Sequence, residues 1–150
     1  MRAVIQRVTH ASVTIDGQLK SEIESGLLAF LGIEENDTQQ DIDWLVKKII
    51  QMRIFSDADG KMNLSVQDIN GDILVISQFT LFASTKKGNR PGFTRSAKPD
   101  TAIPLYEQFL SDMQTQFGKE IYCGAFGADM KVELLNDGPV TIIIDSRNME

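Results

Sequence analysis

Alternating hydrophobic and polar positions predict that the chain begins with strands. Residues 2–15 alternate with period two, which predicts one long strand or two abutting strands. Asp16-Gly17 is a hairpin signal, and a return strand is expected over Leu19–Glu24. The uncharged run Leu27–Ile33 predicts a third, buried strand. The N-terminal part of the chain is therefore expected to be antiparallel sheet.

Apolar residues at helical spacing predict two helices. The first covers about residues 38–50, with a cap at Asn36–Thr38, and its stripe consists of Ile42, Leu45, Val46, Ile49 and Ile50. The second starts between Asp100 and Ile103, because Pro104 is then in the first turn, where proline is tolerated. It ends near Gly118, and its stripe consists of Leu105, Tyr106, Phe109, Leu110, Met113 and Phe117.

The remaining apolar runs predict short strands. They are Met52–Phe55, Asp72–Ile76 continuing into Ser77–Phe82, Met130–Leu135 and Val140–Asp145, with a hairpin turn at Asn136–Pro139 and a frayed tail from Ser146. Together the elements predict an α+β fold. We expect one domain over residues 1–150, with a mostly antiparallel, barrel-like sheet packed by two main helices.

Composition limits the class of protein. The chain has 150 residues, of which 42% are hydrophobic and 24% charged, as in ordinary globular domains. No apolar run approaches the roughly 20 residues of a membrane span, and the first residues lack the apolar core of a signal peptide. The single cysteine permits no internal disulfide. These features predict a cytoplasmic protein that contacts no membrane.

Charge is distributed unevenly along the chain. The net charge of −6 argues against general nucleic-acid binding and against a DNA partner. However, residues 84–98, here called the basic loop, contain no acid and five of the 15 basic residues: Lys86, Lys87, Arg90, Arg95 and Lys98. This loop is either a solvated surface segment or a local phosphate-binding patch.

The familiar catalytic side-chain sets are largely missing. His10 is the single histidine, so a Ser-His or Cys-His catalytic pair would have to use it. A structural role for Cys123 and a position on the sheet surface for His10 are the simpler interpretations. Asp57, Asp59 and Gly60 lack the ligand spacing of a calcium loop, and there is no zinc-type cluster. We therefore expect no metal and no cofactor. A mechanism would rely on backbone donors, hydroxyls and groups of the substrate.

Polar residues on the expected strand over 77–82 form one candidate site. Gln78 and Thr80 point to the same side, and such an amide–hydroxyl pair can hold a polar ligand or simply face water. Thr80 has no histidine near it in sequence to activate it as a nucleophile. Arg7 is a charge among apolar neighbours, and either forms a salt bridge or holds backbone carbonyls in place.

Two separated motifs resemble the D-aminoacyl-tRNA deacylases, the D-tyrosyl-tRNA deacylase family. They are Ser77-Gln78-Phe79-Thr80-Leu81 and Asn136-Asp137-Gly138-Pro139-Val140-Thr141. Supporting segments are Gln6-Arg7-Val8, Arg53–Asp57, Gly60–Leu64, Arg90-Pro91 and Ala128–Met130. The likeness covers about residues 1–145, and the last five residues look like an untypical extension.

The resemblance implies an enzyme that hydrolyses the ester between a D-amino acid and the 3′-terminal adenosine of tRNA. It also implies a homodimer in which a cis Gly138-Pro139 pair enters the partner's active site and excludes L side chains. A site that rejects only an L side chain cannot reject glycine, so glycyl-tRNA is an expected second substrate.

The resemblance also assigns roles to individual residues. Catalytic roles fall on Gln78, Phe79 and Thr80, with backbone N–H groups near Phe79 and Thr80 stabilising the oxyanion. Substrate binding and chiral selection fall on Ser77, Gly138, Pro139, Asn136, Arg7 and Met130, with Arg7 orienting the Gly-Pro carbonyls. Contacts to tRNA fall on Lys86, Lys87, Arg90 and Arg95. The alternatives are a non-catalytic RNA-binding dimer and a dimer with a purely structural turn.

Overall fold

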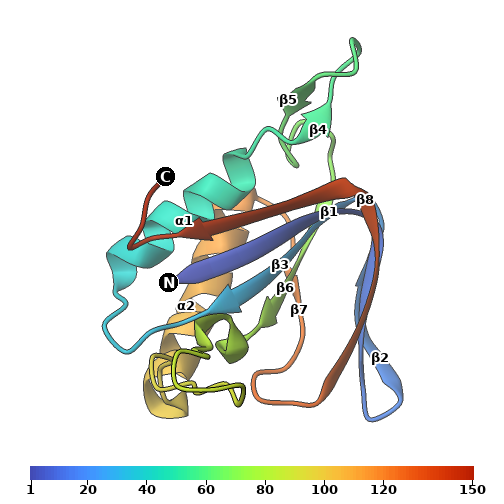
Figure 1. Ribbon diagram of the computed structural model, residues 1–150. Coiled ribbons are helices and arrows are strands. Elements are labelled where there is room, and N and C mark those ends of the chain that lie inside the picture. Colours follow the sequence, from blue (N-terminus) through green and yellow to red (C-terminus); the bar gives the residue numbers. More distant parts are fainter.

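The computed structural model describes all 150 residues (Figure 1). Strand β1, Arg2–Ile15, is hydrogen-bonded to three other strands. It pairs antiparallel with β2, Gln18–Ile23, with β3, Gly26–Gly32, and with β8, Met130–Asp145. Beyond β3 the pairing becomes parallel, through β6, Asp72–Ser77, to the short β7, Tyr122–Cys123. The sheet is therefore mixed and curls into a nearly barrel-shaped form, and the α+β prediction is confirmed.

Both helices lie on one face of this sheet. Helix α1, Gln39–Gln51, connects β3 to the second half of the chain, and α2, Pro99–Phe117, packs beside it (Figure 1). Neither is long and apolar enough to cross a membrane. Sheet residues facing the helices share one core with the two helical stripes, among them Ala3, Ile5, Leu27, Ala29, Leu31, Ile73 and Val75.

A second, smaller core lies inside the curl of the sheet. It consists of Val8, Ala11, Val13, Ile23, Leu28, Leu74 and Ile76. Ile5 and Val8 are three residues apart and lie in cores on opposite faces, as alternation requires, but Val8 and Ala11 are also three apart and share the second core, so the strict alternation predicted over residues 2–15 fails between Val8 and Ala11. The register between β1 and β8 shifts on both sides of Val8, between Gln6 and Val8 and between Val8 and His10. The curl therefore begins at Arg7, because a register shift increases local twist and bends the strand.

The helix boundaries are close to those predicted, with one exception. Thr38 caps α1 in a capping box with Asp41, and Gly118 ends α2 in the left-handed region with φ 74°. However, α2 begins at Pro99, so Pro104 lies inside the helix and not in its first turn. Pro104 is exposed, which lets water reach the carbonyl that proline cannot bond.

The predicted strand over Ser77–Phe82 is wrong beyond its first residue. β6 ends at Ser77, and a short 3-10 helix, η1, Phe79–Phe82, follows. The strand predicted over Met52–Phe55 is also displaced. Only β4, Phe55–Ser56, forms, and it pairs with β5, Met62–Leu64. The two strands and the residues beside them project from the body as the β4–β5 arm, residues 53–64 (Figure 1).

The predicted hairpin at Asn136–Pro139 does not form. Both halves of β8 pair with β1, with Asn136 opposite Val8 and Thr141 opposite Gln6. Residues 137–140 therefore stand opposite the single residue Arg7 and bulge from the ladder. We call this segment the Gly-Pro loop. Because the ladder continues on both sides, the loop is held at both ends by the same neighbouring strand.

The C-terminal tail is anchored and not frayed. Ser146 is buried, and its hydroxyl donates a hydrogen bond to Asp41 at 2.6 Å while accepting one from the Met1 ammonium at 2.9 Å. Arg147 adds charge pairing, since its Nε lies 3.6 Å from Asp37 and 3.5 Å from Asp41. These contacts join the tail to the start of β1 and to α1.

Candidate active site

A cavity of about 240 Å³ opens where β6 gives way to η1. Its walls are mostly apolar, and the polar groups come from Ser77 and Gln78 on one side and Asp129 on the other. Four predicted site residues line it: Ser77, Gln78, Phe79 and Met130. A mostly apolar lining with a few convergent polar groups is typical of a small-molecule site.

Gln78 and Thr80 lie on the same side, as predicted, although the backbone between them is η1 and not strand. The Gln78 side-chain amide donates a hydrogen bond to the Thr80 hydroxyl. Gln78 is itself fixed by the sheet, because its backbone N–H donates to the Leu31 carbonyl at 2.7 Å. The pair is therefore preorganised at the cavity edge. No histidine or carboxylate is hydrogen-bonded to the Thr80 hydroxyl.

Phe79 contributes both its ring and its backbone. Its ring is 56% exposed and meets the Phe93 ring edge-on, with centroids 5.0 Å apart. Its carbonyl accepts a hydrogen bond from the Ser96 hydroxyl at 2.7 Å. The N–H groups of Phe79 and Thr80 belong to the first turn of η1, where a helix offers no internal acceptor. They can donate to a substrate oxygen.

Met130 closes the opposite wall of the cavity. It is the first residue of β8, and its sulfur lies directly over Gly124. A Cβ at Gly124 would lie 2.3 Å from that sulfur, so a larger residue there would force the Met130 side chain to move. Sequence reasoning missed Gly124 beneath Met130, and it missed Phe126 and Gly127 of the cavity wall. None of the three has a polar side chain that would have drawn attention to it.

Arg7 combines the two alternatives that the sequence left open. Its Nε donates to the Asp137 carbonyl at 2.9 Å and lies 3.2 Å from the Asp137 carboxylate. Its Nη1 donates to the Ile54 carbonyl at 2.7 Å. The Arg7 side chain is only 12% exposed, so its bond to the Ile54 carbonyl is partly shielded from water, whereas the Asp137 side chain is 48% exposed. One guanidinium therefore connects the Gly-Pro loop to the base of the β4–β5 arm.

Asn136 is occupied within its own loop. Its side-chain nitrogen donates to the carbonyls of Arg7 at 3.0 Å and Val140 at 2.9 Å, and its side-chain oxygen accepts from the Val140 N–H at 3.3 Å. These bonds bridge the two ends of the Gly-Pro loop. The geometry therefore favours a positioning role for Asn136 over the direct substrate contact expected from the sequence.

Gly138 and Pro139 lie apart from the cavity of their own chain. The peptide bond between them is cis. They stand beside Arg7, whereas η1 lies beside Arg2, whose Nη1 donates to the Leu81 carbonyl at 2.8 Å. Five residues along a strand span about 16 Å. The structure thus brings Ser77, Gln78, Phe79, Thr80 and Met130 together, and leaves Arg7, Asn136, Gly138 and Pro139 as a second group.

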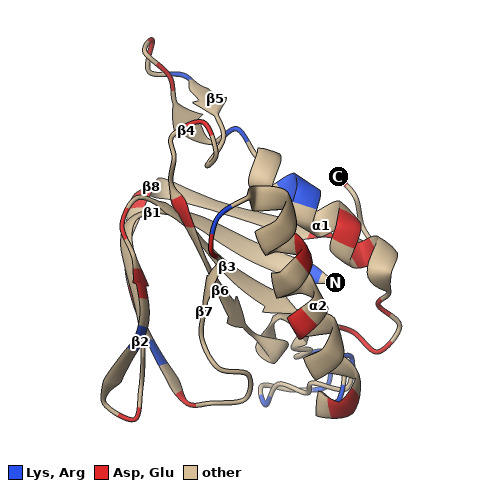
Figure 2. Cartoon of the chain, turned by 180° about the vertical axis from the view of Figure 1, so that it is seen from behind, with Lys and Arg blue, Asp and Glu red and all other residues tan.

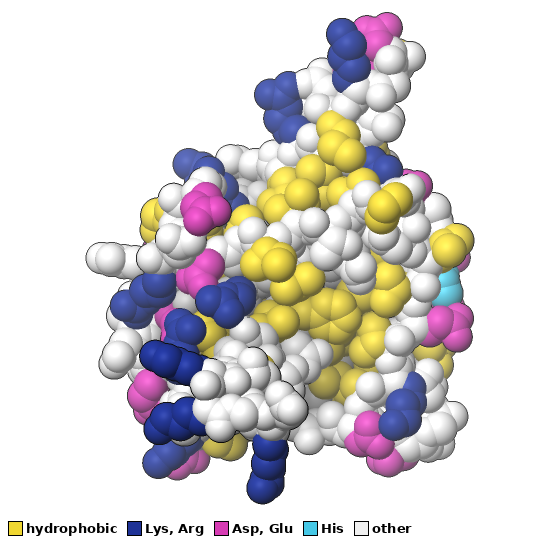
Figure 3. Space-filling view, viewed as in Figure 1, with side chains coloured by type: hydrophobic (Ala, Val, Ile, Leu, Met, Phe, Trp, Pro, Cys, Tyr) yellow, Lys and Arg dark blue, Asp and Glu magenta, His cyan; other side chains and the backbone are white.

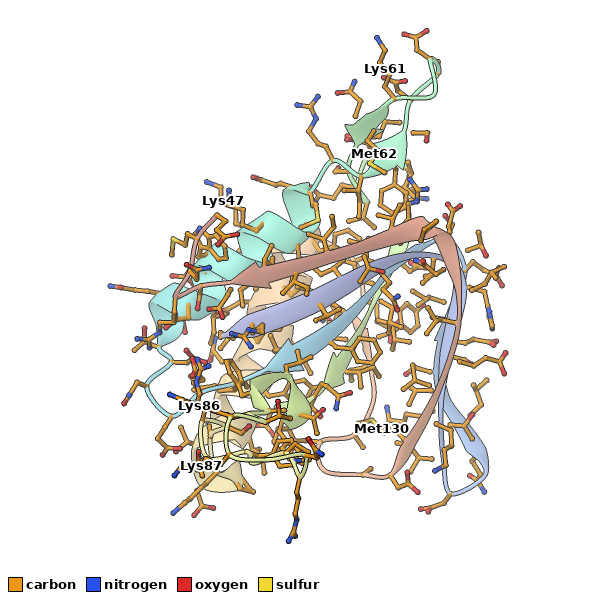
Figure 4. All side chains as sticks on the ribbon, viewed as in Figure 1. Lys47, Lys61, Met62, Lys86, Lys87 and Met130 are labelled. Atoms are coloured by element: carbon orange, nitrogen blue, oxygen red, sulfur yellow. The ribbon has the colours of Figure 1, made fainter.

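The basic loop has more order than its sequence predicts. Ser84 and Gly92 exchange two backbone hydrogen bonds, of 2.8 and 2.9 Å, which close the tip of the loop. The loop lies near the start of α2, where Figure 2 shows its basic residues, and Figure 4 shows Lys86 and Lys87 at its surface. Lys86, Lys87 and Arg90 are exposed and have no ion-pair partner.

Arg95 differs from the other basic residues of this loop. It pairs with Glu34 at 2.7 Å, and its guanidinium lies over the Phe82 ring, 5.3 Å from the centroid. The contact to Glu34 neutralises the charge that a phosphate would need. The geometry therefore favours a structural role for Arg95.

Other candidate groups do not form a site. His10 lies 3.8 Å from Glu133 and is not hydrogen-bonded to Cys123, whose carbonyl accepts from Ser21. Burial raises the pKa of Tyr106, with Cys123 adding to the effect, so its hydroxyl stays neutral. The Asp57 carboxylate accepts backbone N–H groups of its own turn, and no three acidic, histidine or cysteine side chains gather as a metal site.

Comparison with known proteins identifies the family. The model of D-Tyr-tRNA(Tyr) deacylase matches residues 4–145. The chain belongs to this family. It is 63% identical over 150 residues to proteins named D-aminoacyl-tRNA deacylase from Flavobacterium johnsoniae and Bacteroides fragilis, with both chains of each pair fully covered. The family model ends at residue 145, and these relatives also share the five residues that follow it.

Solved structures share the fold. One, described as c-Myc DNA Unwinding Element Binding Protein, superposes with a TM-score of 0.92 at 42% identity, covering 97% of this chain and 98% of the other. Another, described as a probable eukaryotic D-amino acid tRNA deacylase, superposes with a TM-score of 0.83 at 15% identity, covering 95% and 97%. At that identity the second likeness concerns the fold alone.

Proposed function

We propose that this protein hydrolyses the ester bond of D-aminoacyl-tRNA and releases the free D-amino acid and tRNA. Family membership and the names of its relatives support this activity. The observation that carries it for this chain is the cavity at η1. There, an amide–hydroxyl pair and two backbone donors meet beside an exposed aromatic ring.

The chemistry assigned to this cavity is attack of water on the ester carbonyl. The N–H groups of Phe79 and Thr80 stabilise the oxyanion that develops on the carbonyl oxygen. The 2′-hydroxyl of the terminal adenosine assists the water, and the ester oxygen leaves with a proton as the 3′-hydroxyl. Gln78 and Thr80 position the substrate, since nothing bonded to Thr80 can take its proton. The Phe79 ring packs near the adenine.

Chiral selection is assigned to the Gly-Pro loop of a second copy. Within one chain this loop lies about 16 Å along the sheet from η1, too far to contact an ester bound there. Figure 3 shows hydrophobic side chains gathered on the face of the sheet away from the helices, where the second copy would pack, and Ile143 and Leu135 are 68% and 61% exposed. A homodimer supplies the missing wall.

The proposed wall works by exclusion. Backbone atoms of the loop hold the α-amino group and leave no room for an L side chain, while a D side chain points to solvent. The enzyme is then indifferent to the identity of the D-amino acid. It also cleaves glycyl-tRNA, because glycine has no side chain to exclude.

The decisive test compares D-tyrosyl-tRNA with L-tyrosyl-tRNA, using purified protein in the presence of a chelator. Rapid loss of the D-ester alone is the expected result. If neither ester is cleaved while tRNA is still bound, the result would favour a non-catalytic RNA-binding dimer over an enzyme. Equal loss of both would contradict selection by the Gly-Pro loop. Inertness toward glycyl-tRNA would contradict selection by exclusion.

A further inference from the structure

A row of apolar side chains on the β4–β5 arm runs out of the core into solvent. Phe55 is 5% exposed, and its cross-strand partner Leu64 packs against the same core. Met62 begins the same strand and stands opposite Ser56, across a register shift from the Phe55–Leu64 pair. Yet Met62 is 55% exposed. Figure 4 shows it on the arm, below Lys61 in this view.

The arm is held in place at its base. A two-stranded hairpin alone is at best marginally stable in water. Here Arg53 donates to the carbonyl and side chain of Asn63 and ties the two strands together. The Ile54 carbonyl accepts from Arg7 at 2.7 Å, and Arg7 also holds the Asp137 carbonyl. The arm and the Gly-Pro loop are therefore neighbours that share one guanidinium.

This shared contact fixes where the arm must lie in a dimer. If the Gly-Pro loop enters the partner's cavity, as the proposed function requires, the arm of the same chain reaches the rim of that cavity. The exposed part of that rim is Phe79, a residue that is 56% exposed. An uncovered methionine and an uncovered aromatic ring would thus be brought together.

We infer that Met62 of one subunit packs against Phe79 of the partner subunit and closes the outer edge of the site over the terminal adenosine. A thioether at the edge of an aromatic ring is a favourable contact, and the flexible methionine side chain adapts to a bound base. Met62 is thereby a specificity-determining residue contributed in trans. This inference rests on the proposed function and adds a third element to the composite site.

Subunit complementation tests the inference. A Met62→Asp homodimer is expected to cleave D-tyrosyl-tRNA about tenfold more slowly in kcat/KM, because a carboxylate would lie against the ring. An Ala128→Trp homodimer, whose cavity is filled, is expected to be inactive. A mixed dimer of the two variants contains one open cavity served by an intact arm, so its rate should recover toward half of the wild-type value.

Control variants make the result specific. Met149→Asp alters an equally exposed methionine, 61% open, on the C-terminal tail and should leave the rate unchanged. Met62→Leu, of similar volume, should stay within about twofold of wild type. Met62→Gln carries the same test if Met62→Asp does not assemble.

Two outcomes separate this inference from the proposed function. An active wild type with no recovery in the mixed dimer, or with a fully active Met62→Asp homodimer, would overturn the role of the arm alone. A wild type that cleaves no D-tyrosyl-tRNA would overturn the proposed function itself.

Discussion

The Nε of Arg7 contacts Asp137 twice: it donates a hydrogen bond to the backbone carbonyl at 2.9 Å and lies 3.2 Å from the carboxylate. The other end of its guanidinium bonds the Ile54 carbonyl. A planar fork with several donors can make these contacts at once, whereas a lysine ammonium cannot. The Gly-Pro loop is thus positioned from outside by a side chain of the neighbouring strand.

Replacing this fork should loosen the loop. We expect Arg7→Lys to lower the free energy of unfolding by about 1–3 kcal/mol, since a shielded carbonyl loses its donor. The ratio of D- to L-tyrosyl-tRNA cleavage should fall at least about tenfold, or about 1.4 kcal/mol. Parallel denaturation and deacylation assays measure both. Lys20→Arg, an exposed change on β2, is the control, and an unaltered ratio in Arg7→Lys would speak against loop positioning.

Thr80 should prove to be a positioning group. We expect Thr80→Ala to slow D-tyrosyl-tRNA cleavage by about tenfold, because Gln78 loses the hydroxyl that holds it. Thr80→Ser keeps the hydroxyl and should remain near wild type. Rapid quenching followed by mass spectrometry should find no acyl-enzyme in the wild type. A trapped acyl-enzyme, with complete loss of turnover in Thr80→Ala, would make Thr80 the nucleophile instead.

The exposed lysines of the basic loop should contribute to tRNA affinity. Charge reversal at Lys86 and Lys87 should weaken tRNA binding and reduce the slope of log K against log salt by about two, one for each lost phosphate contact. Titrations of labelled tRNA at several salt concentrations provide the slope. The same reversal at Lys47 and Lys48, an exposed pair on α1, should leave it unchanged. Equal effects of both pairs would indicate general charge repulsion.

The anchored tail should make stability depend on acid pH. Burial alone would raise the pKa of Asp41, but hydrogen bonds from Ser146 and Thr38 and the nearby N-terminal ammonium hold it below its usual 3.8. A lowered folded-state pKa contributes stability above the unfolded value, and this contribution is lost as pH falls through the folded value.

The wild type should therefore lose stability below about pH 4. Asp41→Asn should be less stable at neutral pH and lose less on acidification. Urea unfolding at about pH 6 and about pH 3 gives both free energies. Asp43→Asn, an exposed change on the same helix, is the matched control. If Asp41→Asn and the wild type lose the same unfolding free energy on acidification, Asp41 is not the source of the pH dependence.

The interior proline of α2 should be replaceable with a gain in stability. Pro104→Ala supplies an N–H for the Asp100 carbonyl on an exposed face, and we expect about 1–3 kcal/mol of stabilisation. Chemical denaturation provides the measurement. As a control, Ala102→Ser should lower the free energy of unfolding, because Ala102 is buried where α2 packs on the core. A destabilised Pro104→Ala would mean that the proline ring makes a needed contact.

Periodicity found the elements whose packing is local, and missed those fixed from a distance. The stripe of α1 predicted its extent to within a residue, because one face of a helix must meet the core. The start of α2 was missed because Glu35 accepts the Lys98 N–H at 3.2 Å and the Thr101 hydroxyl at 2.8 Å. A cap from another loop leaves no trace in the local sequence.

The site shows the same division. Spacing placed Gln78 and Thr80 on one side, and they lie there through η1, but the residue types alone did not predict that helix. Asn136–Pro139 has the composition of a hairpin turn, yet the strand it pairs with is β1, some 130 residues earlier. Arg95 belongs to a basic segment by sequence and to an ion pair with Glu34 in space.

In the proposed homodimer, the separation of the Gly-Pro loop from the cavity of its own chain would make activity depend on protein concentration. A site assembled from two chains exists only as long as the chains are associated, so the number of working sites follows mass action. Specific activity should then decline on dilution below the dissociation constant and return on concentration. In that proposed dimer the supply of subunits would regulate deacylation before any substrate is bound.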